Sequence, residues 1–367
     1  MSQTVADEAL LGAAPQAARD AARDGATLHA LRADPAACFW GFYDKTLPPI
    51  LTVGSGDVVY VEALTPLAGD APDLLMDEGT RAVYEGIPPE ERGPGPHLMT
   101  GPIALEGAEP GDTLEVRILS MAPRLPYGSN VAGWWGSLYE DFQQEFITVW
   151  ELDSAAGLAR AAFTYEYTAG ERYPVPPVGV VEPDPASRRP TLHGISVPLR
   201  PHFGIAGVAP EEDGKVSSVP PWRFGGNIDN WRIGPGGTMY YPVFNPGALF
   251  YVGDPHLAEG DGELDGTAIE ASANAWLQLI LRKDFPVTSP ILETATHWYT
   301  HGFDEDLNLA MKMAAREMLE FLARRHGLTR EEAYGLVSVV GDLGVTQVVD
   351  LRQGIHCGIP KSVFSAS

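Results

Sequence analysis

Residues 245–270 concentrate side chains that could do chemistry. The stretch contains five glycines, no lysine or arginine, and the residues Asp254, His256, Glu259, Asp261, Glu263, Asp265 and Glu270. Glycines such as Gly260 and Gly262 let the backbone turn tightly, which a merely solvated acidic surface would not need. Carboxylates packed this closely repel one another unless they share a cation or a proton. The stretch therefore predicts either a divalent metal site or a carboxyl group held neutral for proton transfer.

The elements that must position this stretch are predicted to be mainly β-strands. Strands are expected at 50–53, 58–61, 101–105, 114–119, 147–152, 162–167, 204–208, 238–243, 268–281 and 345–349. The first two are expected to pair around a tight turn at Ser55 and Gly56. Segments 66–97 and 122–142 are expected to be long irregular loops. Strands joined by turns of this kind are typical of jelly rolls and small barrels.

Clear helical periodicity is confined to the C-terminal part. Residues 304–325 carry one apolar stripe and are followed by Gly327, which predicts a helix that ends there. Thr329 and Glu332 have the spacing of a capping box at the start of a second helix. The predicted fold class is mostly β, with jelly-roll or barrel-like β domains and a small C-terminal α+β segment of two helices and a strand.

The same pattern predicts four regions along the chain. Residues 1–30 are Ala-rich and are expected to form a loose, flexible N-terminal extension or a marginal surface helix. An N-terminal β domain is expected over 31–185, ending in a Pro-rich linker at 173–189. A second β domain, which carries the acidic Gly-rich site, is expected over 186–290. The C-terminal α+β segment is expected over 291–367.

Composition limits the partners. A net charge of −24 over 367 residues, with a pI near 4.6, repels nucleic acid and anionic membranes. It favours a neutral or cationic small substrate. The sequence lacks a long apolar run and an N-terminal signal pattern, so a cytoplasmic protein is expected. Two cysteines, Cys38 and Cys357, make neither a disulfide framework nor a cysteine zinc site.

Several reaction classes leave signatures that this sequence lacks. There is no G-x-S-x-G nucleophile elbow, no H-E-x-x-H zinc motif and no glycine-rich nucleotide loop. The two cysteines are best interpreted as small buried apolar residues. His297 and His301 could share a metal only on a helix, and the residues between them form helices poorly. We therefore interpret both as structural histidines.

An ordered set of short motifs resembles the acetamidase/formamidase family. The pieces are PPILTV at 48–53, TGPI at 100–103, EGAEPGD at 106–112, GIAGVAP at 204–210, GGNID at 225–229, Pro242, PGAL at 246–249, GDPH at 253–256, GDGE at 260–263, GTAIE at 266–270, DLN at 306–308, GDL at 341–343, QVVD at 347–350 and PKS at 360–362. The resemblance implies a β-rich, homo-oligomeric enzyme that hydrolyses short linear amides to carboxylate and ammonia. The chain departs from the family at Glu259, where glutamine is expected.

An amide carbonyl is a poor electrophile, so its hydrolysis needs an activated nucleophile, polarisation and an acid for the leaving amine. We expect a divalent metal, zinc or calcium, to activate a water, and activation by the Glu263 carboxylate without metal stays open. Asp254 and His256 lie two apart and would face the same way on a strand. With Asp229 and His97 they are the predicted metal ligands.

The other predicted site residues have catalytic or substrate-binding roles. Glu263 is the predicted base, Glu270 a second catalytic group, and His256 both ligand and catalytic residue. Thr100, Trp134 and Trp135 are predicted to contact the substrate.

Other interpretations stay open at this stage. Asp229 and Asp254 could cap turns, and the tryptophans could serve the core or an oligomer contact. The protein could be a non-enzymatic β-sandwich binding protein with a structural calcium site. It could also hydrolyse an amide or carbamate with a protein nucleophile. A metal-dependent oxygenase would need two histidines and a carboxylate, and only His256 stands in the cluster.

Overall fold

The computed structural model describes residues 8–167 and 185–364. The largest sheet has nine strands. In spatial order they are β1 (Leu28–Leu31), β5 (Val58–Ala63), β17 (Ala273–Arg282), β7 (Thr113–Pro123), β15 (Thr238–Pro242), β18 (Ile291–Glu293), β19 (His297–Asp304), β21 (Gln353–Pro360) and β20 (Asp342–Val345). The strands come from the beginning, middle and end of the chain, so this one sheet crosses every predicted domain boundary.

Three smaller sheets complete the β structure of the described residues. The six-stranded sheet comprises β14 (Gly225–Asn227), β12 (His202–Val208), β16 (Phe250–His256), β6 (Leu98–Leu105), β2 (Cys38–Trp40) and β4 (Leu51–Val53). The four-stranded sheet comprises β11 (Val197–Pro198), β10 (Leu158–Tyr167), β9 (Glu145–Asp153) and β8 (Tyr127–Ala132). The short strands β13 (Val216–Ser217) and β3 (Phe42–Tyr43) form a pair.

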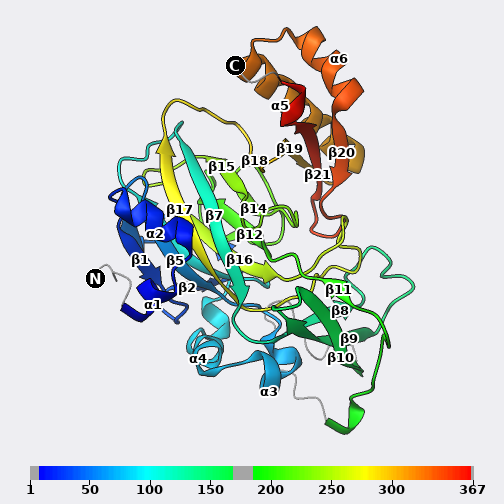
Figure 1. Ribbon diagram of the computed structural model, residues 1–367. Helices are drawn as coiled ribbons and strands as arrows, with labels where there is room; N and C mark the ends of the chain where they lie inside the picture. The colour runs from blue at the N-terminus through cyan, green and yellow to red at the C-terminus, as the bar shows by residue number, and fades with distance from the viewer. Residues whose placement is uncertain (1–7, 168–184, 365–367) are drawn as a thin grey trace.

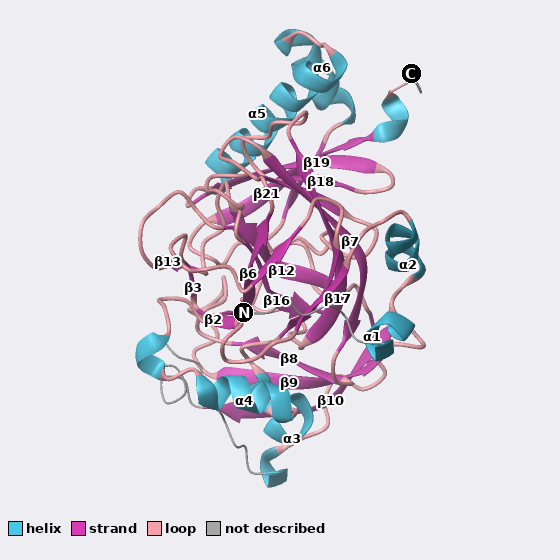
Figure 2. Cartoon of the chain, turned by 90° about the vertical axis from the view of Figure 1, so that its left-hand side faces the viewer, coloured by secondary structure: helices cyan, strands magenta, loops and turns pink. Residues whose placement is uncertain are grey.

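The main core lies between the nine-stranded and six-stranded sheets. Val59 and Leu277 from the first sheet and Ile205 and Phe250 from the second belong to one cluster of buried apolar residues. The long strands β7 and β17 curve around β12 and β16, as Figure 2 shows. Burial of both inner faces explains why these strands contain mostly apolar residues. The predicted mostly-β, barrel-like fold class is confirmed.

Helices cover the outside of the sheets. The C-terminal pair, α5 (Leu307–His326) and α6 (Arg330–Val340), lies against β19, β20 and β21 (Figure 1). α5 ends at Gly327, which has φ 67°, and Thr329 with Glu332 forms the predicted capping box of α6. The Thr300 hydroxyl donates to the Ala314 carbonyl at 2.7 Å, which ties α5 to β19. The two predicted C-terminal helices are therefore confirmed.

Several local predictions were wrong because tertiary pairing decided the outcome. β4 and β5 do not form a hairpin, since β4 pairs with β6 while β5 pairs with β1 and β17. Segment 66–97 is not an irregular loop: it holds α3 (Pro72–Leu75), α4 (Glu78–Gly86) and the short helices η1 (Ala68–Asp70) and η2 (Pro89–Glu91). Segment 122–142 contains the end of β7 and all of β8. The C-terminal strands are β20 and β21, so the expected strand at 345–349 is absent.

The ends of the chain and the linker complete the account. The described part of the predicted extension forms α1 (Glu8–Ala13) and α2 (Gln16–Arg23), and β1 continues it into the nine-stranded sheet. Most of the predicted linker, residues 173–184, lies outside the described residues, and η3 (Pro185–Ser187) lies in its described part. η4 (Lys361–Val363) follows β21. Among the described helices, none is long and apolar enough to span a membrane.

Candidate active site

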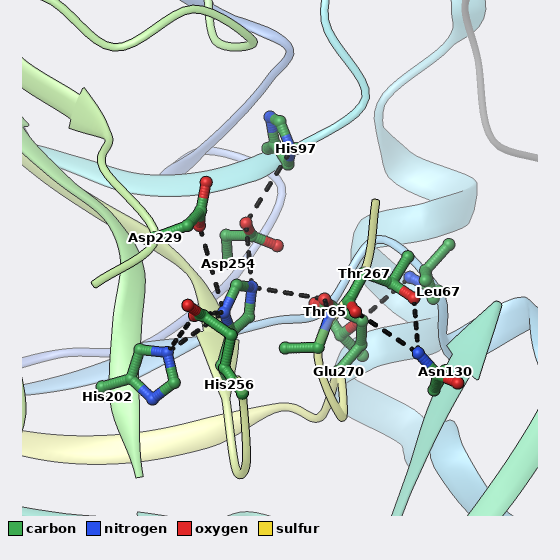
Figure 3. A network of polar contacts seen from close by, with 12 residues as sticks. Thr65, Leu67, His97, Asn130, His202, Asp229, Asp254, His256, Thr267 and Glu270 are labelled. Atoms are coloured by element: carbon green, nitrogen blue, oxygen red, sulfur yellow. Dashed lines mark hydrogen bonds and ion pairs between the residues drawn. The ribbon is translucent and has the colours of Figure 1, made fainter. Parts of the chain in front are cut away.

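His256, the last residue of β16, is the centre of a buried polar cluster (Figure 3). Its Nε2 lies 3.2 Å from Asp254 Oδ2 and 3.2 Å from Glu270 Oε1. Its Nδ1 lies 3.1 Å from Glu259 Oε2 and 3.9 Å from Asp229 Oδ1. The imidazole therefore touches four carboxylates, three of which come from the stretch 245–270.

Pairing between β12 and β16 adds a residue that sequence reasoning missed. His202 lies directly opposite His256 in the ladder, and its Nε2 lies 2.6 Å from Glu259 Oε2. The expectation that only one histidine stands in the cluster is therefore wrong. The local sequence around His202 held no signal, because only the register between the two strands brings these histidines together. Glu259, the residue at which the chain departs from the family pattern, contacts both imidazole rings.

Backbone strain gathers at the same place. Asp229, Asp254 and Glu263 have φ values of 49°, 50° and 44°. A non-glycine residue in the left-handed region costs roughly 1–3 kcal/mol when the position is sparsely populated, and such residues cluster at active sites and ligand clamps. Three carboxylate residues in this conformation around one histidine indicate that the fold holds their side chains in place at the expense of stability.

Burial and mutual repulsion perturb the acid–base behaviour of the cluster. Burial, followed by repulsion from neighbouring carboxylates, raises the pKa of Asp229 and of Glu263 well above the ordinary range. Burial also raises the pKa of Glu270 well above its usual value, although His256 opposes the shift. Shared protons or a bound cation would relieve the repulsion among these buried carboxyl groups.

Asp254 and His256 behave in the opposite way. Burial alone would raise the pKa of Asp254, but His97 and His256 outweigh it and lower that pKa. Burial alone would lower the pKa of His256, but Glu270 and Asp254 outweigh it and raise that pKa well above the usual value. Without a metal, the two form a charged pair at the centre of the cluster.

The donor set fits a divalent cation. Three groups of three residues could each hold a metal ion, since within each group the ligand atoms lie within 4.8 Å of one another. His256 belongs to all three groups: with Asp229 and Glu263, with Asp254 and Glu270, and with His202 and Glu259. Both carboxylate oxygens of Asp229, one of Glu259 and one of Glu270 are buried with no hydrogen-bond partner among the described residues. Buried anionic oxygens without partners are costly, and a metal ion would satisfy them.

The cluster opens onto a cavity of about 610 Å³. The lining residues are Pro66, Leu67, Pro94, Gly95, Pro96, His97, Trp134, Trp135, Ser217, Val219, Asn227, Asp254, Glu263, Gly266, Thr267, Glu270, Val349, Asp350 and Leu351. Three carboxylates of the cluster thus face a space that a substrate could enter. Asp350 was not predicted as a site residue, and burial raises its pKa to about 7.

The remaining predicted site residues are placed at different distances from this centre. Trp134 and Trp135 line the cavity. His97 lines it too, with its Nδ1 2.9 Å from Ser218 Oγ and its Nε2 3.8 Å from Asp254 Oδ2, and it stands outside the three ligand groups. Thr100 is not a lining residue: its hydroxyl donates to the Glu62 carbonyl at 2.7 Å. The geometry therefore brings Thr100 to neither the cluster nor the cavity.

Gly204 on β12 leaves the space that the cluster occupies. A Cβ at this position would lie 2.6 Å from Asp229 Oδ1, 2.7 Å from His256 Cε1 and 2.8 Å from Asp254 Oδ2. We expect Gly204→Ala to displace these side chains and to reduce bound metal and turnover by at least about 10-fold each, since small misplacements at a site cost this much or more. Metal analysis and steady-state kinetics measure both.

Gly335→Ala is the matched control for Gly204→Ala. Gly335 lies in α6 and has no atom within 4 Å of an added Cβ. This control should keep wild-type metal content and turnover. Normal metal content in Gly204→Ala would show that the cluster does not need the space in front of this glycine.

Glu145 on β9 holds Trp134, because its Oε1 accepts a hydrogen bond from the indole Nε1 at 3.1 Å. Burial raises the pKa of Glu145 to about 7, and the bond from Trp134 only partly opposes this. A carboxyl whose pKa is higher in the folded state binds more protons there, so stability falls as pH rises from about 4.5 to about 7. The total loss for this group is roughly 3 kcal/mol.

We therefore expect Glu145→Gln to remove this pH-dependent loss. Glutamine keeps an oxygen that can accept from Trp134 but does not ionise. The free energy of unfolding of the variant should decline less than that of the wild type between pH 5 and pH 8, as denaturant titrations at several pH values measure. Parallel pH profiles for the two proteins would mean that burial of Glu145 is not the source.

Comparisons with known proteins identify the family. The Acetamidase/Formamidase family model matches residues 94–214 and 213–366. The chain belongs to the acetamidase/formamidase family.

Individual relatives are distant. The chain is 29% identical to an acetamidase of Mycolicibacterium smegmatis over 46% of its own length and about half (49%) of the relative's. It is 25% identical to a formamidase of Methylophilus methylotrophus over 73% of its own length and 77% of the relative's. The crystal structure of an acetamidase from Bacillus halodurans superposes with a TM-score of 0.71 at 27% identity, covering 91% of this chain and 98% of the other. Membership in the family supports a hydrolase that acts on the C–N bond of amides.

Proposed function

We propose that this chain of the acetamidase/formamidase family hydrolyses the C–N bond of a neutral linear amide to carboxylate and ammonia. The observation that carries the proposal is the buried carboxylate cluster around His256, which opens onto one cavity through Asp254, Glu263 and Glu270. Buried acids with perturbed pKa values in a cavity are the usual setting for general acid–base chemistry.

A divalent metal is proposed to complete the site. Asp229, Asp254 and His256 would hold it, with Glu270 beside them. His256 shares one ligand group with Asp229 and another with Asp254 and Glu270, and Asp229 and Glu270 carry unsatisfied oxygens. Zinc and calcium are the candidates, and a carboxylate-rich set with one or two histidines suits either. When bound, such an ion lowers the pKa of a water and polarises the amide carbonyl.

Glu263 and Glu270 divide the proton transfers. Glu263 faces the cavity and accepts a proton from the attacking water, and burial raises its pKa, which makes its carboxylate a stronger base. Oxygen from that water bonds to the amide carbon as the C–N bond breaks. Burial raises the pKa of Glu270 and so favours its protonated form, which donates a proton to the departing nitrogen. The nitrogen leaves as ammonia.

The protein's own contacts hold these groups in position. Glu270 Oε1 accepts a hydrogen bond from the Ala268 backbone at 2.9 Å, and the Glu270 backbone pairs with Ser129 on β8. His97 steadies Asp254 and is itself held by Ser218. A preorganised set of this kind lowers the barrier because little rearrangement remains for the transition state.

An oxygenase with a two-histidine carboxylate site is not favoured, although His202, His256 and Glu259 provide such a group. Neither histidine lines the cavity, and both side chains have at most 1% of their surface exposed. An oxygenase site needs open positions that face the substrate.

Ammonia release tests the proposal directly. The protein would be assayed with formamide, acetamide, propionamide, larger and aromatic amides and carbamates, before and after chelation. Release that chelation abolishes and that zinc or calcium restores would support the metal-assisted reaction. Release that survives chelation would support amide hydrolysis without metal, with Glu263 either activating the water or acting as the nucleophile. No release from any member would overturn the proposal and favour a binding protein.

A further inference from the structure

The cavity is much larger than a short amide requires. Formamide and acetamide have three and four heavy atoms, whereas cavities of roughly 300–1,000 Å³ accommodate ligands of drug size. At about 610 Å³ the cavity lies in the middle of this range. A short amide in such a space would be held by few contacts and would leave most of the wall exposed to water.

The cavity wall has a polar part and an apolar part. The polar part contains His97, Asn227, Asp254, Glu263, Glu270 and Asp350, which belong to or adjoin the cluster. Most of the other lining residues are apolar, with two tryptophans, Leu67, Val219, Val349, Leu351 and three prolines among them. The lining includes no lysine or arginine, so an acyl group that carried a carboxylate would find no permanently charged cation to pair with.

The two tryptophans present apolar surface to the cavity. Their ring centroids lie 5.4 Å apart. The indole N–H of Trp134 donates to Glu145 and that of Trp135 donates to the Val131 carbonyl at 3.3 Å. Because protein atoms accept the hydrogen bonds of both indole N–H groups, the rings contribute mainly apolar surface to the cavity. Such surface favours contact with apolar or aromatic groups.

The tryptophan pair is tied to the catalytic groups. Trp135 packs against Gly266, where an added Cβ would lie 3.0 Å from its ring. Strand β8, which precedes the pair, exchanges two backbone hydrogen bonds of 2.9 and 2.7 Å between Ser129 and Glu270. The apolar wall and the proposed proton donor are therefore held at a fixed separation, as recognition of one size of acyl group requires.

Leu351 is an apolar residue exposed to solvent at this cavity. Its exposed fraction is 71%, and its backbone has φ 63°. Both features are unfavourable for a leucine. A left-handed backbone costs energy for a residue with a Cβ, and an exposed apolar side chain gains nothing from burial in the free protein. It directly follows Asp350, which belongs to the polar part. A ligand with an apolar group would cover this side chain.

We propose that the amide carries a large apolar acyl group, of about the size of phenylacetyl, and that Trp134, Trp135 and Leu351 determine this specificity. The inference rests on the proposed amide hydrolysis and adds the substrate class. The amide carbon lies at the carboxylate cluster, and the acyl group lies against the tryptophan pair. Binding energy from this remote group orients the amide for attack.

The test compares amides that share ammonia as the leaving group, using enzyme saturated with zinc or, in parallel, calcium. Values of kcat/KM would be measured for acetamide, hexanamide, phenylacetamide and the charged succinamate. Burial of the added phenyl group in the transition state favours the larger amide, so phenylacetamide should exceed acetamide by roughly 100-fold or more. Succinamate should not exceed acetamide. Equal or lower kcat/KM for phenylacetamide would overturn the inference while acetamide turnover would leave the amidase proposal intact.

Variants identify the residues. Leu351→Asn removes the exposed apolar side chain, and asparagine tolerates the left-handed backbone, so folding is not at risk. Leu351→Asn and Trp134→Ala should each lower the phenylacetamide-to-acetamide ratio of kcat/KM by about 10-fold. Tyr334→Ala, which removes an aromatic residue 70% exposed on α6, is the control and should leave the ratio unchanged. An unchanged ratio in both cavity variants would contradict their assignment.

Binding separates the substrate class from the reaction. Binding of phenylacetamide and acetamide would be measured by calorimetry and by intrinsic tryptophan fluorescence. If the protein releases no ammonia from any amide, tighter binding of phenylacetamide that Leu351→Asn weakens would still support the apolar acyl site and would overturn only the proposed reaction. Absence of such binding, together with absence of turnover, would overturn both.

Discussion

Replacing His256 with alanine should lower turnover by about two to four orders of magnitude and remove most of the bound metal. His256 belongs to each of the three ligand groups, and it touches Asp254, Glu259 and Glu270 within 3.2 Å. Alanine would leave these buried carboxylates with one another and with no central cation. Removing one partner from a buried charge cluster typically costs about 3–5 kcal/mol.

Three measurements on His256→Ala separate chemistry from folding. Ammonia release gives kcat, elemental analysis gives metal per chain, and denaturant unfolding gives stability. His29→Ala is the matched control, because His29 is also buried and pairs with a carboxylate, Asp57, at 3.0 Å, but lies on β1 in the nine-stranded sheet. The control should lose stability and keep kcat and metal. Near-normal turnover and metal content in His256→Ala would contradict the assignment of the site.

Residues of this site could be predicted from the sequence where they lie close together in the chain. Glu259, Glu263 and Glu270 could be found because one short Gly-rich stretch carries them with His256. His202 could not, since it is an isolated polar residue in an apolar strand. Asp350 stood in the sequence only as the end of the QVVD motif at 347–350, to which no role was attached. Pairing of β12 with β16 brings His202 to His256, and this register has no counterpart in the local sequence.

Local signals predicted some elements and missed others for the same reason. The capping box at Thr329 acts within one turn of helix and was sufficient to place α6. The turn at Ser55 and Gly56 is also local, but the strands on either side enter different sheets, so the predicted hairpin does not form. For α4, the N-cap Asp77 accepts from Thr80, a signal that was present in the sequence but overlooked among prolines and glycines.

Replacing Glu263 with glutamine is expected to have the second large effect, a fall in kcat of about two to four orders of magnitude. Glutamine has nearly the same shape as glutamate but cannot accept the proton of the attacking water. Because Glu263 is buried, lines the cavity and has φ 44°, the isosteric change is the least disruptive way to test its role.

Metal content decides how Glu263 acts. If it is the base, Glu263→Gln should retain most of the metal, because Asp229, Asp254 and His256 remain, and kcat should fall at every pH tested. If it is primarily a ligand, metal content should fall together with kcat, and added metal should restore part of the activity.

Asp261→Asn is the matched control for Glu263→Gln. It removes a carboxylate from the same Gly-rich stretch, but Asp261 binds Arg232 and Trp231 at the surface, with a side chain 43% exposed. The control should keep kcat within a fewfold of wild type, as surface substitutions usually do. Wild-type turnover in Glu263→Gln would exclude it as base and as nucleophile. The water would then have to be activated by another cluster carboxylate that lines the cavity, with Asp254 and Asp350 as the candidates because Glu270 is assigned as the acid.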